Sequence, residues 1–144
     1  MPKSIVFVTI PGRPVPKGRP RLGKHGVYTP ETTAEAEKVL QVCFKQACPV
    51  PLEGSLELGV SFYFRRPDSW RKEQRTATDE DGAEPWRLGR PDLDNLLKLL
   101  KDAGNGILWK DDAQVVKIDA VKVYGAENET VVNLNVLTEE DALG

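Results

Sequence analysis

The chain has 144 residues, of which 40% are hydrophobic and 29% are charged, and its formal net charge is −2. These values are typical of one globular domain, which we expect over residues 1–144. No apolar run approaches the ~18 residues of a membrane span, and the N-terminus does not resemble a signal peptide. The spacing of Cys43 and Cys48 does not suit a disulfide, so we expect a cytoplasmic protein without membrane contact.

The charges are segregated along the chain. Residues 1–26 hold six basic residues and no acidic one, whereas residues 113–144 hold six acidic residues and two lysines. The average charge argues mildly against a nucleic acid partner. The segregation nevertheless predicts a local basic surface that an average conceals.

The N-terminal part predicts a buried strand followed by a basic arm. Residues 4–10 are rich in β-branched side chains, which favours a strand. Residues 13–25, which we call the basic arm, contain too much proline and glycine for a helix or a central strand. We expect the arm to contact DNA phosphates, with a solvated loop as the alternative reading. Its candidate DNA-binding residues are Arg13, Lys17, Arg19, Arg21 and Lys24.

A helix and a second strand follow. Thr29, Pro30 and Glu31 are typical of a helix start, and prolines at positions 49 and 51 end the apolar pattern that follows. Residues 55–64 alternate strictly between apolar and other side chains, which predicts a half-buried strand.

Residues 65–90 show no helical or alternating pattern. They contain seven basic and six acidic residues, and a loop of this length is usually functional or disordered. Arg65, Arg66 and Arg90 are candidate DNA contacts in a clamp-like loop, and a mobile solvated insert is an equally good interpretation.

Residues 90–116 carry the most informative pattern. Four leucines recur at helical spacing and predict a helix with one buried stripe: Leu93, Leu96, Leu97 and Leu100. Asp94 and Lys98 fall one turn apart on the opposite side of that helix. The helix is therefore expected to attach to a core through one face and to present acid and base on the other.

Two aspartate pairs flank this helix. Asp92 follows a proline and would suit a helix cap, which is the plain structural alternative. Capping does not account for Asp94, Asp111 and Asp112, and carboxylates gathered in one place repel one another unless a cation lies among them. Oxygen ligands suit a hard ion such as Mg²⁺, and Lys98 could face a phosphate. We expect all four acids to lie together at one edge of the sheet.

The C-terminal part predicts two strands, at residues 115–124 and 130–138, joined as an antiparallel hairpin by a turn at 125–129. Residues 139–144 are expected to form a frayed acidic tail. The element order β-α-β-α-β-β predicts a mixed α/β domain of the α+β class, with one mixed sheet and the helices packed on it.

The motifs resemble those of the RusA family of Holliday-junction resolvases, small endonucleases found in bacteria and their prophages. The chain reads DLDNLLK at 92–98, DA at 102–103 and DDAQV at 111–115. The opening GRPVPKGRPR at 12–21 and the P-x-x-T segment at 30–33 also match. One departure is Gly104, where the family usually has a helix former, and we expect it to end the helix early.

The resemblance implies a RusA-like fold, a homodimer and a metal-dependent reaction. It assigns the catalytic, metal-binding carboxylates to Asp92, Asp94 and Asp112, and an essential lysine to Lys98. Asn95 and Asp111 are expected to orient those ligands. Mg²⁺ is the expected cofactor, with Mn²⁺ as a substitute.

The leading functional hypothesis is a structure-selective DNA endonuclease that resolves four-way junctions by paired nicks during recombination and repair. The expected partners are branched DNA and a second copy of the chain, since a twofold dimer matches a junction with two equivalent strands. An alternative is a branched-DNA-binding module that does not cut. A third reading, a metal-stabilised structural domain, is disfavoured by the acid-free basic arm.

Overall fold

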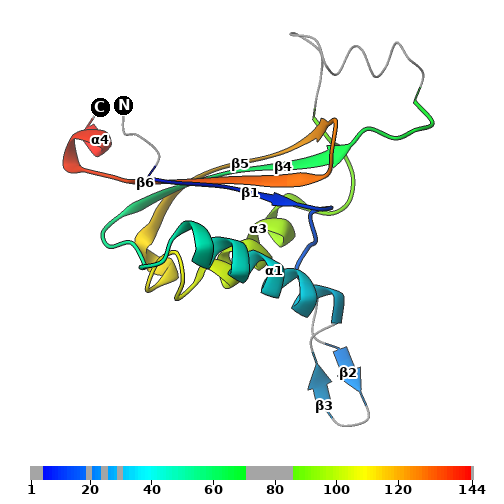
Figure 1. The fold of residues 1–144 in the computed structure, drawn as a ribbon, viewed down its shortest axis with the longest axis horizontal. Coiled ribbons are helices and arrows are strands. Elements are labelled where there is room, and N and C mark those ends of the chain that lie inside the picture. Colours follow the sequence, from blue (N-terminus) through cyan, green and yellow to red (C-terminus); the bar gives the residue numbers. More distant parts are fainter. Residues whose placement is uncertain (1–4, 19–20, 24–25, 29–30, 71–85, 144) are drawn as a thin grey trace.

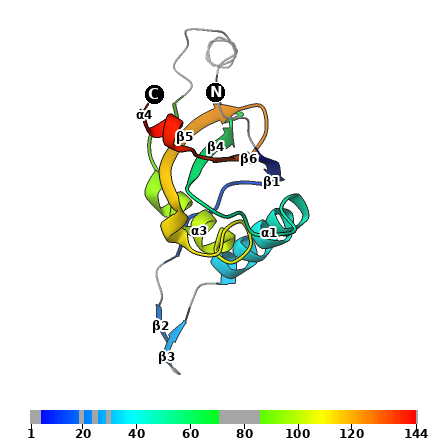
Figure 2. The same ribbon diagram turned by 90° about the vertical axis from the view of Figure 1, so that its left-hand side faces the viewer.

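The computed structural model describes residues 5–18, 21–23, 26–28, 31–70 and 86–143. It shows a four-stranded sheet with helices α1 and α3 on one face and a two-stranded hairpin projecting beyond them (Figures 1 and 2). The elements are β1 (Val6–Pro11), β2 (Arg21–Gly23), β3 (Gly26–Tyr28), α1 (Glu31–Ala47), β4 (Leu56–Arg65), α3 (Leu93–Gly104), the 3-10 turn η1 (Asp112–Gln114), β5 (Val115–Gly125), β6 (Glu129–Val136) and α4 (Glu139–Leu143).

The main sheet is mixed, as the sequence predicts, but its strand order differs from the expected one. The order is β1-β6-β4-β5, with β4 and β5 parallel and the other neighbours antiparallel. The predicted hairpin of β5 and β6 is therefore wrong, because β4 lies between them. The turn wraps around the end of β4, where Asn128 Oδ1 accepts from the backbone N–H of Arg65 at 2.8 Å.

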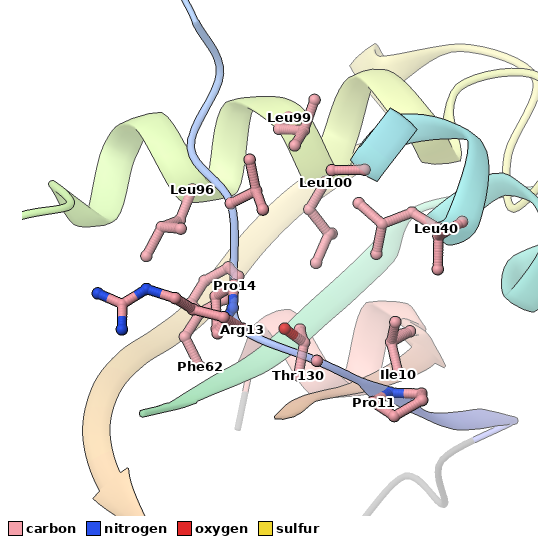
Figure 3. A pocket seen from close by; sticks show the side chains of 14 residues that line it. Ile10, Pro11, Arg13, Pro14, Leu40, Phe62, Leu96, Leu99, Leu100 and Thr130 are labelled. Atoms are coloured by element: carbon pink, nitrogen blue, oxygen red, sulfur yellow. The ribbon is translucent and has the colours of Figure 1, made fainter. Parts of the chain in front are cut away.

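The core lies between the sheet and the two long helices. The predicted alternation of β4 is confirmed, since its five apolar side chains on the helix-covered face are at most 3% exposed: Leu56, Leu58, Val60, Phe62 and Phe64. Burying such a side chain contributes about 1.5–3 kcal/mol. A small apolar pocket of about 160 Å³ remains where Leu96, Leu99 and Leu100 of α3 approach Leu40 of α1 and Phe62 of β4 (Figure 3).

The leucine stripe of α3 is rotated slightly from its predicted position. Leu96, Leu99 and Leu100 are each 1% exposed, whereas Leu93 and Leu97 are half-buried at the margin of the core. Leu99 fell outside the predicted stripe because α3 packs against α1 as well as against the sheet, and burial on two sides widens its apolar face.

Two further elements differ from the expectations. The last part of the basic arm carries β2, which forms a short hairpin with β3 directly after the arm, and the proline-rich sequence did not predict this hairpin. The predicted frayed tail is the short helix α4, whose start is fixed by Asp141, because its Oδ2 accepts from the backbone N–H of Thr138 at 2.6 Å. Among the described helices, none is long and apolar enough to cross a membrane.

Candidate active site

Asp92 and Asp94 stand exposed at the start of α3. Asp92 occupies the N-cap position with extended backbone angles, φ −69° and ψ 141°, yet its side chain accepts no capping hydrogen bond. Asp92 therefore does not cap α3 through its side chain, which was the structural alternative, because a capping carboxylate would accept from an N–H of the first turn. Its two oxygens are left available to a ligand in front of the helix.

The start of α3 forms one wall of an open hollow of about 350 Å³. The hollow unites residues that are far apart in the sequence, and they come from the basic arm, the segment before α3 and its first turn: Arg13, Pro14, Pro16, Lys17, Arg90, Pro91, Asp92 and Asn95. Three predicted DNA-binding residues and two predicted site residues thus share one cavity. This arrangement places positive charge beside an uncapped carboxylate.

The arm forms its wall of the hollow because it is tied to both helices. The backbone N–H of Lys17 donates to the carbonyl of Asn95 at 3.0 Å. The Lys17 ammonium lies 3.0 Å from Asp102 Oδ2 and 3.8 Å from Glu37 Oε1. Lys17 therefore has a clear structural role, and its contact with DNA stays a prediction. Arg13 is more exposed, with its guanidinium carbon 5.3 Å from the ring centre of Phe64.

The two acids of the second pair, Asp111 and Asp112, accept hydrogen bonds from different groups. Asp111 caps the 3-10 turn η1, because its Oδ1 accepts from the backbone N–H of Ala113 at 2.9 Å. In return, the backbone N–H of Asp111 donates to Gln114 Oε1. Asp112 instead accepts from the indole N–H of Trp109 through Oδ1 at 2.7 Å. Trp109 is fully buried, and a buried indole N–H requires an acceptor. The same bond fixes the direction of the Asp112 carboxylate.

The two acid pairs lie at opposite ends of α3, because Asp92 and Asp94 stand at its start and the segment that carries Asp111 and Asp112 packs against its end. At its start, the ammonium of Lys122 on β5 donates to the carbonyl of Pro91 at 2.9 Å. At its end, Trp109 packs so close to Gly104 that a Cβ on the glycine would lie 3.1 Å from two ring carbons. A helix of 12 residues spans about 18 Å, which separates the two ends. β5 begins beside the end of α3 and runs back along it, so Lys122 reaches the helix start, whereas Asp111 and Asp112, which precede the strand, do not.

The predicted convergence of all four carboxylates within one chain is therefore wrong. Across the part of the chain that the structure describes, no group of three or more histidine, cysteine or acidic side chains is placed to hold a metal ion. The separation arises because the 12-residue helix α3 lies between the two pairs. The leucine pattern that predicted this helix therefore also implies the separation.

Gly104 ends α3, as the sequence predicts, and the structure adds a reason for it. Its missing side chain makes room for Leu108 and Trp109, both of which are fully buried. Sequence reasoning did not single out Trp109. The available signal was a donor-only side chain three residues before an aspartate, a spacing at which a turn brings the two together.

The other predicted residues have mixed placements. Lys98 is exposed on α3, one turn beyond Asp94, and forms no ion pair with it. Arg65 pairs with Asp68 at 3.1 Å, and the backbone N–H of Arg66 donates to Gly125. The side chains of Arg19, Arg21 and Lys24 lie outside the described part of the structure, so their DNA contacts stay predictions.

Comparison with known proteins decides the family. The model of the family described as "Endodeoxyribonuclease RusA" matches residues 11–135. The chain belongs to the RusA family. The match extends from the basic arm to β6, so it includes the hollow, both acid pairs and three of the four strands of the main sheet. The resemblance of the short motifs is thereby confirmed over most of the chain.

Two curated proteins are similar to this chain. One is 29% identical over 124 residues, covers 83% of this chain and 87% of its own length, and is named "Uncharacterized protein YqaN" from Bacillus subtilis (strain 168). The other is "Crossover junction endodeoxyribonuclease rusA" of Lactococcus phage r1t, 30% identical over 93 residues. That match covers 64% of this chain and 58% of the phage protein.

Proposed function

We propose that this member of the RusA family is a Mg²⁺-dependent endonuclease that cuts four-way DNA junctions by paired nicks and so acts in recombination and repair. The observation that carries the proposal is the uncapped carboxylate of Asp92 in a hollow lined by Arg13, Lys17 and Arg90. A carboxylate among phosphate-binding side chains would weaken DNA binding unless it served a cation or the reaction. The name of the phage relative supports junction DNA as the substrate.

The residues at the start of α3 fit Mg²⁺. Proteins usually hold this ion with one or two carboxylates and leave other positions to water and substrate phosphate. Asp92 and Asn95 line the hollow, and the exposed Asp94 in the first turn of α3 offers a second carboxylate close to them in the chain. When bound, Mg²⁺ would polarise the scissile phosphate and make water a better nucleophile. Lys98, one turn further along α3, would stabilise negative charge on the phosphate.

A third acid, Asp112, joins this site only if a second chain supplies it. Within one chain, Asp112 lies at the far end of α3 from Asp92, and the helix between them is about 18 Å long. A twofold dimer places the start of one α3 near the end of the other when the two helices run antiparallel. In the proposed homodimer, each site therefore combines Asp92 and Asp94 of one chain with Asp112 of the other.

The alternative of a non-catalytic branched-DNA binder would use the same basic walls. It gives no role to Asp92, because that carboxylate neither caps α3 nor neutralises a neighbour among the described side chains. A nuclease gives a role both to the basic walls of the hollow and to the Asp92 carboxylate, so we favour it.

A single assay tests the proposal. The purified protein is incubated with a labelled four-way junction and with linear duplex of the same sequence, in Mg²⁺, in Mn²⁺ and in excess EDTA. We expect paired cuts in the junction with either metal, little cutting of the duplex, and none in EDTA. Tight junction binding without cleavage in Mg²⁺ would instead establish the binding module, and cleavage in EDTA would overturn the metal assignment.

A further inference from the structure

Three successive backbone carbonyls in the segment that leads into α3 are held by two basic side chains. The ammonium of Lys122 donates to the carbonyl oxygens of Gly89 at 2.6 Å and Pro91 at 2.9 Å. The guanidinium of Arg87 donates through Nη2 to the carbonyl of Arg90 at 2.8 Å. All three peptide units before the N-cap residue of α3 thus have their carbonyl directions fixed by cations.

Both cations are anchored to the sheet. Lys122 is half-buried on β5, which pairs with β4 along its length. The guanidinium carbon of Arg87 lies 4.3 Å from the ring centre of Phe64 and 5.7 Å from that of Tyr124, within the range of cation–π attraction. The backbone N–H of Arg87 also donates to the carbonyl of Lys122 at 3.1 Å. The segment is therefore fastened to the two strands β4 and β5 of the main sheet.

This fastening matters for Asp92 because no described residue forms a hydrogen bond with its carboxylate. Its side chain accepts no hydrogen bond from the first turn of α3, so the direction of its carboxylate depends on the backbone that precedes it. Hydrogen bonds from an ammonium or a guanidinium are shorter and stronger than neutral ones, which suits them to fixing a peptide.

We propose that Lys122, assisted by Arg87, is a positioning residue for the metal-binding carboxylate of Asp92. This inference rests on the proposed nuclease function, in which Asp92 holds Mg²⁺. Lys122 acts through the backbone of residues 89–91 and does not touch the ion. Supporting groups of this kind typically change metal affinity or activity by about 10- to 100-fold when removed.

A direct role of Lys122 in DNA binding would not explain why its ammonium is bound to two backbone carbonyls. An ammonium has three N–H donors, and two of them are already bound to protein carbonyls. Exposed lysines that bind phosphates do not need such partners. The experiment therefore separates positioning from binding.

The test uses Lys122→Met, which keeps the unbranched stem and removes the ammonium. Lys117→Met is the matched control, because Lys117 is on the same strand but its ammonium pairs with Glu57 at 3.0 Å, away from the segment before α3. Lys122→Arg tests rescue, since a guanidinium can also donate to two carbonyls. Each full-length variant is assayed for single-turnover junction cleavage across Mg²⁺ concentrations, for junction binding in Ca²⁺, and for amide hydrogen exchange over residues 86–97.

We expect Lys122→Met to cut at least about tenfold more slowly at low Mg²⁺ and to recover partly at high Mg²⁺. Its hydrogen exchange at the start of α3 should rise, while binding in Ca²⁺ changes less than about threefold. Lys117→Met should match the parent, and Lys122→Arg should recover part of the loss. Arg87→Lys, which keeps the charge but loses the Nη2 bond, should behave like Lys122→Met and serves if that variant does not fold.

The inference is overturned if Lys122→Met keeps the Mg²⁺ dependence and hydrogen exchange of the parent, or if Lys117→Met shares its defect. A loss of junction binding equal to the loss of cleavage would assign Lys122 to DNA binding and would also overturn it. A parent protein that never cuts junctions would refute the proposed function separately, and the exchange data would then decide whether Lys122 orders the segment.

Discussion

At the scale of single residues, the four aspartates that look equivalent in the sequence have different surroundings. Asp111 caps a turn, Asp112 is bound by a buried indole, and Asp92 and Asp94 are exposed without such a bond. Two carboxylates are thus committed to local structure by at least one hydrogen bond, and two are free to meet a ligand. The sequence identified the acids, but it could not assign these roles because each depends on which N–H lies nearby.

The first prediction concerns Asp94. Asp94→Asn keeps the size of the side chain and removes one negative charge, so cleavage should fall by orders of magnitude if this carboxylate holds Mg²⁺. Junction binding should be equal or tighter, because a charge facing phosphate has gone. Stability should change by no more than about 0.5 kcal/mol, as for other exposed substitutions, and a melting curve checks this. Parent-rate cleavage by a normally folded variant would refute the assignment.

The second prediction concerns Trp109. Trp109→Phe keeps most of the buried ring but removes the N–H that binds Asp112, which should cost about 1 kcal/mol for the hydrogen bond, with a further loss from the smaller ring. Urea unfolding measures the difference. Trp86→Phe is the control, because Trp86 is 53% exposed and its replacement should have little effect.

The Trp109 variant also tests the catalytic role of Asp112. If this carboxylate holds the metal, loosening it should raise the Mg²⁺ concentration required for cleavage. A variant as stable as the parent would show that the indole bond contributes nothing, and unchanged cleavage of a destabilised variant would remove Asp112 from the site.

At the scale of elements, the sequence predicted α1, β4 and α3 well because each has a strong apolar period of its own. The order of strands was not predictable in this way. β5 and β6 are consecutive and separated by a short turn, which normally indicates a hairpin, yet β4 takes the place between them. A strand with five fully apolar inward positions gains most from the centre of a sheet, and that preference outweighed the local turn signal.

The basic arm gives the third prediction. Arg13 and Arg90 face the hollow from two different segments, so replacing both by alanine should weaken junction binding. The slope of log affinity against log salt should become shallower by roughly 0.9 for each phosphate that the variant no longer neutralises. Lys38 and Lys45, which are exposed on α1, provide a control pair with the same change of charge.

Binding measured by electrophoretic mobility shift at several salt concentrations separates the two pairs. An unchanged slope in the Arg13 and Arg90 variant would mean that these guanidinium groups do not bind phosphates. An equal effect in the Lys38 and Lys45 control would mean that only total charge matters.

At the scale of the whole molecule, the length of α3 is the reason that we propose a site made by two chains. Its leucines bind it along the sheet as a straight element, so the acids before and after it cannot meet within one chain. The sequence suggested the opposite because the two acid pairs are close neighbours along the chain. In the proposed homodimer, a site shared by two chains would restore the three-acid set and would place two sites in one dimer, which suits two symmetrical cuts.

Mixed dimers test this central claim most directly. Chains carrying Asp94→Asn and Asp112→Asn are co-expressed with different tags, and dimers that contain both are isolated by two affinity steps. If each site takes Asp94 from one chain and Asp112 from the other, one site of the mixed dimer carries both changes and the other carries none. With sites inside single chains, both sites carry one change.

The assay is cleavage of a supercoiled plasmid with an extruded cruciform, in which paired cuts give linear DNA and a single cut gives nicked circles. The account predicts that the parent gives linear DNA, that neither single-variant dimer cuts, and that the mixed dimer gives nicked circles. A mixed dimer that is as inactive as the two single-variant dimers would contradict the shared site.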